Sequence, residues 1–262
     1  MDLGIGERCC VVTGGSGGVG AEVGRRLCAE GANVMLVGRG EARLEQAAAD
    51  CGDRAQTLAL DLTAADAGDL VVGACMERFG RLDVVVNCAG MTAVTAIDEL
   101  SDADWQAHWE LHVMAPMRLM RAAIPAMVRA GWGRVVNVSS SSGKRPGQRN
   151  VAYSVTKAAL LSLSRAYADA YAAAGVLVNA VTPGPLAGDL WLAPDGLVDQ
   201  TVAARGGTRE QVLEAAAAGL PVRRLGEPGE IADVIVFLCS EAASNVAGAA
   251  WSVDGGAVPV II

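Results

Sequence analysis

Histidine is scarce in this chain, which has only His108 and His112 among its 262 residues. The seven cysteines are scattered through apolar segments, and none of them forms a C-x-x-C pair. Structural metal sites usually need Cys and His ligands at close spacing, so the sequence predicts no metal site. An odd number of cysteines in apolar segments favours buried, reduced thiols in a cytoplasmic protein over disulfides.

Long apolar runs and a basic excess are also missing. No run reaches the roughly 18–20 residues that span a bilayer, and the first residues lack the basic and apolar stretches of a secretory signal. The net charge of −8 and the pI of about 4.8 disfavour a nucleic-acid partner. With 52% apolar residues the chain can build a large core. We therefore expect a globular cytoplasmic protein with neither a membrane nor a nucleic-acid partner.

Short apolar strands alternate with helical segments along the whole chain. This rhythm is typical of βαβ units, in which a parallel sheet is buried on both faces. No linker-like segment and no internal repeat interrupts it. The sequence predicts one α/β domain over residues 1–262, a doubly wound Rossmann-type sandwich with a seven-stranded parallel sheet and helices on both faces. The expected strands are residues 8–13, 33–37, 55–60, 84–86, 135–139, 176–181 and 249–253.

A glycine-rich turn follows the first expected strand. It reads Thr-Gly-Gly-Ser-Gly-Gly-Val-Gly over residues 13–20, and Val19, Val23 and Leu27 then recur at helical spacing. Glycines let the backbone approach a pyrophosphate, and the free N–H groups of the following helix bind it. This strand, turn and helix predict a dinucleotide site.

The second expected strand ends in Gly38-Arg39, with no acidic residue before Glu41. NAD enzymes commonly place an acid at this point for the ribose hydroxyls, whereas an arginine suits the 2′-phosphate of NADP. Arg39 therefore favours NADP(H), with NAD(H) as the alternative.

Tyr153 and Lys157 lie four residues apart in a run, residues 150–174, that is typical of one long helix. Positions i and i+4 share a helix face, so the phenol and the ammonium point the same way. A neighbouring cation favours the phenolate, and we expect it to lower the pKa of the tyrosine toward the working range of a general acid or base.

At this point the chain resembles the short-chain dehydrogenase/reductase family, in its compact branch of about 250 residues. The resemblance runs from end to end and rests on several motifs in order. They are the glycine motif of residues 13–20, Asp61, the Asn-Cys-Ala-Gly of residues 87–90, Ser140 thirteen residues before Tyr153, the Tyr153/Lys157 pair, Asn179 and Pro183-Gly184.

The resemblance implies a role for each matching residue. Tyr153 would be the general acid in carbonyl reduction and the base in alcohol oxidation. Lys157 would hold the nicotinamide ribose, and Ser140 would polarise the substrate oxygen. His112 occupies the slot of the asparagine that usually completes the catalytic tetrad. The implied cofactor-binding residues are Gly14, Ser16, Gly18, Val19, Gly20, Arg39, Asp61, Leu62, Asn87, Ala89, Gly90, Tyr153, Lys157, Pro183 and Gly184.

Two positions depart from the family pattern. In the family the main-chain carbonyl at the His112 position, at a helix kink, holds a water that feeds the lysine. Pro116 lies four residues later, has no N–H and clashes with the carbonyl at 112, so we expect it to preserve that kink. The second departure is Gly188, where relatives often carry a threonine that contacts the cofactor.

Residues 186–221 leave the strand–helix rhythm, and the resemblance implies that they form a substrate lid. Apolar residues such as Trp191 and Leu192 in this lid segment suit a partly apolar substrate. Lys144, Arg145 and Arg149 precede Tyr153, and they could either attract an anionic substrate or form a solvated rim.

We predict an NADP(H)-dependent oxidoreductase that interconverts a ketone and a secondary alcohol. A 3-oxoacyl thioester is one candidate substrate, and a small, polyketide-like or cyclic ketone fits as well. The alternatives are an NAD-dependent alcohol dehydrogenase of the same family and a non-catalytic cofactor-sensing protein on the same fold. The resemblance and the apolar tail, residues 257–262, predict a homotetramer.

Overall fold

The structure is a computed structural model, and it describes residues 2–259. Its seven strands form one parallel sheet in the order β3-β2-β1-β4-β5-β6-β7. The order reverses after β1, which gives the doubly wound topology that the sequence predicted. The strands are β1 (Cys9–Thr13), β2 (Asn33–Gly38), β3 (Ala55–Ala59), β4 (Val84–Asn87), β5 (Gly133–Val138), β6 (Val176–Pro183) and β7 (Ala250–Val253).

All seven expected strands are confirmed, and the differences lie at their ends. Strand β5 starts at Gly133 and stops at Val138, so Ser139 lies outside it. Strand β6 continues to Pro183 because Ala180–Pro183 pair with β7. A proline is tolerated there because it is the last residue of the strand and donates nothing to the ladder.

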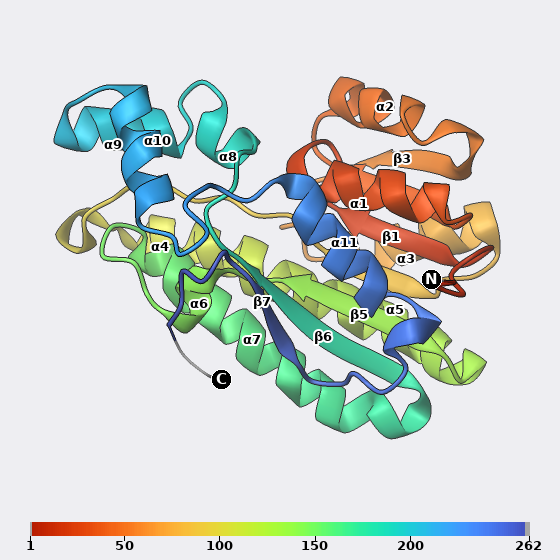
Figure 1. The fold of residues 1–262 in the computed structure, drawn as a ribbon. Coiled ribbons are helices and arrows are strands. Elements are labelled where there is room, and N and C mark those ends of the chain that lie inside the picture. The colour runs from red at the N-terminus through yellow and green to blue at the C-terminus, as the bar shows by residue number, and fades with distance from the viewer. Residues whose placement is uncertain (1, 260–262) are drawn as a thin grey trace.

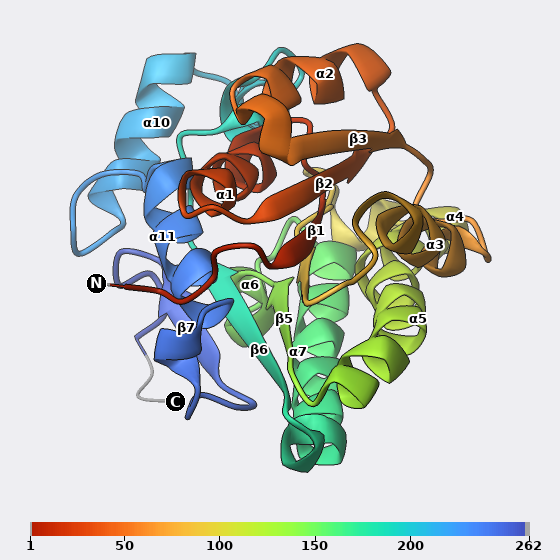
Figure 2. The same ribbon diagram turned by 90° about the vertical axis from the view of Figure 1, so that its right-hand side faces the viewer.

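Helices cover both faces of the sheet (Figures 1 and 2). Successive side chains of each strand point to opposite faces of the sheet. Val12 of β1 packs in a core with α1 and α11, whereas Val11 packs in a second core with α3 and α5. The helices that form these layers are α1 (Gly18–Ala29), α2 (Glu41–Ala49) and α11 (Pro228–Leu238) on one face, and α3 (Ala67–Phe79), α5 (Ala115–Ala130) and α7 (Val151–Tyr171) on the other.

The helix expected from residue 150 to 174 is α7, and a short 3-10 turn, Ala172–Ala174, continues it. Helix α3 begins at Ala67, and a turn precedes it, in which the backbone N–H of Ala67 bonds the carbonyl of Ala64. Helix α4 (Asp102–Trp109) passes into α5 through a π-helical segment, Glu110–Met114.

The lid segment, residues 186–221, contains three short helices, which are α8 (Asp189–Leu192), α9 (Leu197–Arg205) and α10 (Arg209–Ala218). Figure 1 shows them together beyond the carboxyl ends of the strands, and the four-residue helix α6 (Ser141–Lys144) follows the carboxyl end of β5. In open α/β sheets ligands bind at that end of the strands. The fold therefore places the candidate site between the sheet and the lid segment.

Candidate active site

Tyr153 and Lys157 lie one turn apart on α7 and face the same cavity. The Lys157 ammonium lies 5.6 Å from the centre of the Tyr153 ring, and the lysine is only 4% exposed. Its Nζ donates a hydrogen bond of 2.8 Å to the carbonyl of Val138, at the end of β5. The carboxyl end of the sheet therefore holds the lysine in place beside the tyrosine.

The expected lowering of the tyrosine pKa is wrong for this structure. Burial raises the pKa of Tyr153, and a hydrogen bond with Ser140 opposes that rise only in part. Burial also lowers the pKa of Lys157 from 10.5 to about 8, because the low-dielectric interior disfavours the charged ammonium. Desolvation is thus the largest cause of the pKa shift in both groups.

The serines after β5 have separate partners. Ser139 Oγ donates to the Lys157 carbonyl at 2.8 Å, so this hydroxyl braces the catalytic helix. Ser140 caps α6 by accepting the Ser142 N–H, and it also hydrogen-bonds with Tyr153. Ser142 Oγ lies 3.5 Å from the side-chain nitrogen of Asn150. The choice of Ser140 as the catalytic serine stays a prediction, and the geometry supports it because this hydroxyl lies beside the phenol.

His112 connects two parts of the site through its buried ring. Its Nε2 accepts the backbone N–H of Met91 at 3.1 Å, and its Nδ1 lies 3.0 Å from the Thr156 hydroxyl. Burial and the neighbouring Lys157 lower the pKa of His112 to about 2, so the ring is neutral. A neutral ring that accepts at Nε2 carries its proton on Nδ1, which donates to Thr156 Oγ1. His112 therefore ties the loop after β4 to the catalytic helix and does not itself gain or lose a proton near pH 7.

The helix around His112 departs from α-helical geometry in the way that Pro116 requires. Pro116 is at the start of α5 and has no N–H for the carbonyl four residues earlier. The chain widens there into the π-helical segment, in which the N–H of Ala115 bonds the carbonyl of Glu110. The predicted distortion is present, whereas the water relay through the His112 carbonyl stays a prediction.

His108 is a neighbour that the sequence reading missed. Its ring centre lies 5.3 Å from that of His112 and 6.4 Å from that of Tyr153. Burial lowers the pKa of His108. The four-residue spacing of the two histidines was the available signal, since it puts both rings on one helix face.

Two substitutions of His112 test whether its hydrogen bonds, rather than the imidazole itself, are what the site needs. We expect His112→Leu to lose about 1–3 kcal/mol in the free energy of unfolding, because the Met91 N–H becomes a buried donor with no acceptor. We also expect kcat to fall by about 10–100-fold as the loop after β4 shifts. His112→Asn should stay within about threefold of the wild type, since an amide can accept from Met91 and donate to Thr156. Urea unfolding and steady-state kinetics measure both effects, and equal losses in the two variants would contradict this role.

The glycine-rich turn has the close approaches that its motif predicts. A Cβ at Gly14, where φ is +69°, would lie 2.9 Å from the backbone of Ala89. A Cβ at Gly20 would lie 2.3 Å from the Gly14 carbonyl oxygen. The Thr13 hydroxyl also accepts the N–H groups of Cys88 and Ala89 at 3.0 and 3.2 Å. The turn and the loop after β4 are therefore packed backbone against backbone, and the start of α1 faces the cavity between them.

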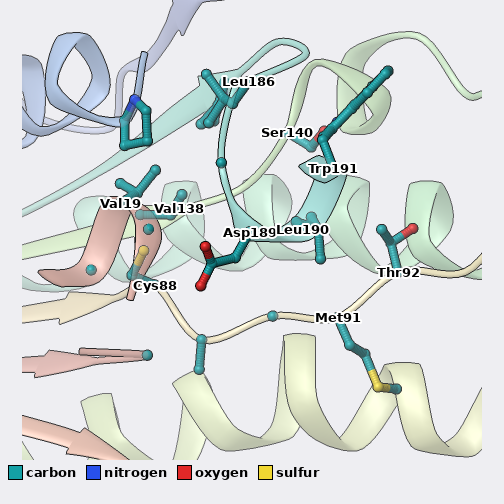
Figure 3. Close-up of a pocket in the computed structure, with 18 of the residues that line it drawn as sticks. Val19, Cys88, Met91, Thr92, Val138, Ser140, Leu186, Asp189, Leu190 and Trp191 are labelled. Carbon is teal, nitrogen blue, oxygen red and sulfur yellow. The ribbon is translucent and has the colours of Figure 1, made fainter. Parts of the chain in front are cut away.

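One cavity of about 440 Å³ joins the residues expected to bind the cofactor to those expected to act on substrate. Figure 3 shows Val19, Cys88 and Val138 toward one end of it, and Met91, Thr92, Ser140 and Trp191 toward the other. Most of the predicted residues line this cavity, namely Gly14, Ser16, Gly18, Val19, Gly20, Arg39, Ala89, Gly90, Ser140, Tyr153, Lys157, Pro183 and Gly184.

Three predicted cofactor residues do not line the cavity. The carboxylate of Asp61 accepts from the backbone and the hydroxyl of Thr63, at 3.0 and 2.8 Å. Leu62 is buried in the core on the α3 side, and the Asn87 side chain donates to Asn137 at 2.8 Å, which links β4 to β5. In this structure the three side chains contact other parts of the protein around the site, and a direct contact between them and the cofactor stays a prediction.

Residues of the lid segment also line the cavity. Gly188, the position where relatives often have threonine, precedes α8 and lines the cavity together with Asp189, Leu190 and Trp191. The basic residues before Tyr153 do not line it. Lys144 instead donates to the Ala250 carbonyl at 2.8 Å and to Ser252 Oγ at 3.0 Å. The hypothesis that Lys144, Arg145 and Arg149 attract an anionic substrate gains no support from this geometry.

Arg43 is a second residue that the sequence reading missed. It lies on α2, one turn after Arg39, and both arginines line the cavity next to the glycine-rich turn. Spacing alone could have indicated it, since residues 39 and 43 are four apart at the start of a helix.

Residues 2–259 contain no group of three or more histidine, cysteine, aspartate or glutamate side chains placed to hold a metal ion. No helix in this part of the chain is long and apolar enough to cross a membrane. The seven cysteines are free thiols.

Comparison with known proteins agrees with this geometry. A family model described as short chain dehydrogenase matches residues 8–193. The Short-chain reductase protein NovJ of Streptomyces niveus is 34% identical over 254 residues, which cover 95% of this chain and 94% of that protein. A cis-4-hydroxycyclohexanecarboxylate dehydrogenase of Sinomonas cyclohexanicum is 36% identical over 253 residues, covering 95% of this chain and 96% of that protein.

Solved structures give the same result. L-sorbose reductase from Gluconobacter frateurii, complexed with NADPH and L-sorbose, superposes with a TM-score of 0.93 at 34% identity and covers all of both chains. A variant of actinorhodin polyketide ketoreductase with NADPH has a TM-score of 0.91 at 28% identity, over 96% of this chain and 97% of that one. By sequence and by fold, this chain belongs to the short-chain dehydrogenase family and is an NAD(P)-dependent oxidoreductase.

Proposed function

We propose that the protein reduces an uncharged ketone to a secondary alcohol with NADPH, and that the reaction is reversible. The observation that carries this proposal is the shared cavity, in which the Ser140 and Tyr153 hydroxyls meet at one end and Arg39 lines the other. NADPH would supply the hydride. The protein would supply the proton from Tyr153 and the hydrogen bond from Ser140 that polarises the carbonyl.

The raised pKa of Tyr153 suits the proton-donating role, because a phenol that is protonated at neutral pH can give its proton to a developing alkoxide. Lys157 would contribute its positive charge next to that phenol and hold the ribose. Gly14, Gly18 and Gly20 would receive the pyrophosphate against the free amides at the start of α1.

The charged side chains among the described residues that line the cavity are Arg39, Arg43, Lys157 and Asp189, and of these Lys157 lies beside Tyr153. The lining of the substrate end combines apolar side chains with hydroxyl and amide groups, namely Met91, Thr92, Ser142, Asn150, Leu190, Trp191 and Leu197. A carboxylate or a phosphate would find no guanidinium there, since Arg39 and Arg43 lie at the glycine-rich turn. This lining favours a neutral, hydroxylated or cyclic ketone over a 3-oxoacyl group on an acidic carrier protein.

The names of the relatives point to ketones and ring alcohols, and they differ in the charge of the compound. One solved relative is a reductase held with NADPH and L-sorbose, a neutral sugar ketone, and one related enzyme is named for a hydroxylated cyclohexane ring. The ring compound of that second enzyme carries a carboxylate, so it offers a direct contrast in charge.

A matched pair of ketones tests the proposal. The purified enzyme is assayed for NADPH and NADH consumption with L-sorbose, cyclohexanone, 4-oxocyclohexanecarboxylate and a 3-oxoacyl thioester. We expect NADPH to be preferred and kcat/KM to be at least about tenfold higher for cyclohexanone than for its carboxylate, because the site would have to desolvate the charge without a partner. A preference for the carboxylate or for the thioester would overturn the substrate class. Tight cofactor binding without turnover on any of them would favour the cofactor-sensing alternative.

We also propose a homotetramer in the cytoplasm. Trp109 of α4 and Val155 of α7 are exposed by 40% and 42%, and large apolar side chains at helix surfaces favour subunit contacts. Of the apolar tail predicted to assist, residues 260–262 lie outside the described residues. Light scattering tests the assembly, and a monodisperse monomer would contradict it.

A further inference from the structure

An ion pair connects the nucleotide-binding half of the protein to the lid segment. Arg43, in the first turn of α2, pairs with Asp189, the first residue of α8. Both side chains are largely exposed, at 64% and 60%. Figure 3 shows the Asp189 carboxylate directed away from Trp191 and Ser140, toward the side of the cavity where Val19 and Cys88 lie. The lid thus places a negative charge at the cofactor end of the cavity.

The pair lies directly against the glycine-rich turn. A Cβ at Gly17 would be 2.6 Å from Arg43 Nη2 and 3.0 Å from Asp189 Oδ2. A side chain at residue 17 would therefore have to displace the ends of these two charged side chains. Arg39, Arg43 and Asp189 all line the same cavity, and Ser16 lies next to the end of β2.

Arg39 and Arg43 bracket the start of α2, whose N-cap residue Gly40 offers no side-chain cap. If Arg39 receives the 2′-phosphate, as the proposed function holds, the Arg43 guanidinium is one helical turn away. A phosphate dianion offers two charges and three acceptor oxygens, whereas Asp189 offers one charge. An exposed ion pair contributes little to stability, so the phosphate can replace the carboxylate at Arg43 with little loss.

We propose that Asp189 is a cofactor-specificity residue that acts through Arg43. The 2′-phosphate of NADP(H) replaces the Asp189 carboxylate as the ion-pair partner of Arg43. NAD(H) lacks that phosphate and leaves the Arg43–Asp189 pair intact. Because Asp189 starts the helix that carries Leu190 and Trp191, the exchange also frees the lid residues that line the substrate end. The inference rests on the proposed use of NADP(H), and it adds a residue from the lid to the choice of cofactor.

Dissociation constants for NADPH and NADH, from fluorescence titration of the full chain, test the proposal. Asp189→Asn keeps the shape and removes the competing charge, so NADPH should bind about 3–10-fold more tightly while NADH stays unchanged. Arg43→Gln should weaken NADPH by about tenfold and leave NADH unchanged. In the double variant the Asp189 effect should vanish, since it needs Arg43. Asp199→Asn is the matched control, because Asp199 pairs with Arg209 inside the lid segment.

The outcomes separate this inference from the proposed function. If Arg39→Gln loses NADPH binding but Asp189→Asn changes both cofactors equally, the lid contact is only structural and this inference is wrong. If the Asp189 effect persists without Arg43, the inference is wrong as well. If the wild type and Arg39→Gln bind NADPH and NADH alike, the proposed cofactor preference fails, and the role of Asp189 fails with it.

Discussion

Replacing Tyr153 with phenylalanine is expected to lower kcat by about 10²–10⁴-fold, the usual contribution of general acid catalysis. The substitution removes one oxygen from a half-buried ring that lies edge-on to His112 at 5.4 Å and leaves that packing in place. The variant should therefore fold normally and bind NADPH with little change. Steady-state turnover with the ketone panel and NADPH titration measure the two effects separately.

Tyr167→Phe is the matched control for this substitution. Tyr167 is on the same helix, nearly three turns after Lys157, and it packs on Tyr171 at 5.8 Å between ring centres. Loss of its hydroxyl should leave kcat within about twofold of the wild type, as expected for a surface-side substitution away from the site. A Tyr153→Phe enzyme that keeps a tenth or more of the wild-type kcat would remove Tyr153 from the role of proton donor.

The second large effect concerns Lys157. Its charge is needed beside Tyr153, and burial lowers the pKa of Lys157 to about 8. The protonated form is the active one, so kcat/KM for NADPH-dependent reduction should be flat below pH 8 and fall above it. This parameter reports the free enzyme, in which that pKa applies. Lys157→Met should lower kcat by about 10²–10³-fold, the usual loss on removing one preorganised charge-stabilising group.

One further variant tests the origin of that pH profile. Lys157→Arg keeps a positive charge above pH 10, so its residual activity should lack the fall near pH 8. A fall that persists in Lys157→Arg would assign it to another group.

The same burial has a consequence for stability. The folded pKa of Lys157 lies below the unfolded value of 10.5, so folding disfavours the charged form. The cost is fully present below pH 8 and is relieved as the pH rises from 8 to 10.5. Lys157→Met should therefore be more stable than the wild type at pH 7, on the order of 2 kcal/mol after the lost bond to Val138 is counted. Urea unfolding at pH 7 measures the difference, and a less stable variant would contradict it.

The sequence predicted the sheet well because parallel strands buried on both faces are continuous apolar runs, as in residues 84–86. Their ends were less certain, since a strand ends where its partner does. Pro183 belongs to β6 only because β7 pairs with it. Membership of the family could also be predicted from the sequence, because the glycine-rich turn and the Tyr153/Lys157 pair depend on local spacing within a turn and a helix.

The sequence could not predict which groups surround the site residues. Lys144 is close to Tyr153 in the chain, yet it bonds to β7. Asp189 is 146 residues from Arg43 and still pairs with it. Likewise, Ser139 and Ser140 are adjacent in sequence, but only the fold assigns one hydroxyl to the Lys157 carbonyl and the other to Tyr153.

By itself, then, the sequence determined the α/β fold, the family and the face of α7 that carries Tyr153 and Lys157, because each depends on local periodicity and spacing. The tertiary structure decided the neutral state of His112, the raised pKa of Tyr153, the lowered pKa of Lys157 and the pairing of Arg43 with Asp189. Those properties depend on how much water is excluded and which distant groups meet, and both are set only when the chain closes around the cavity.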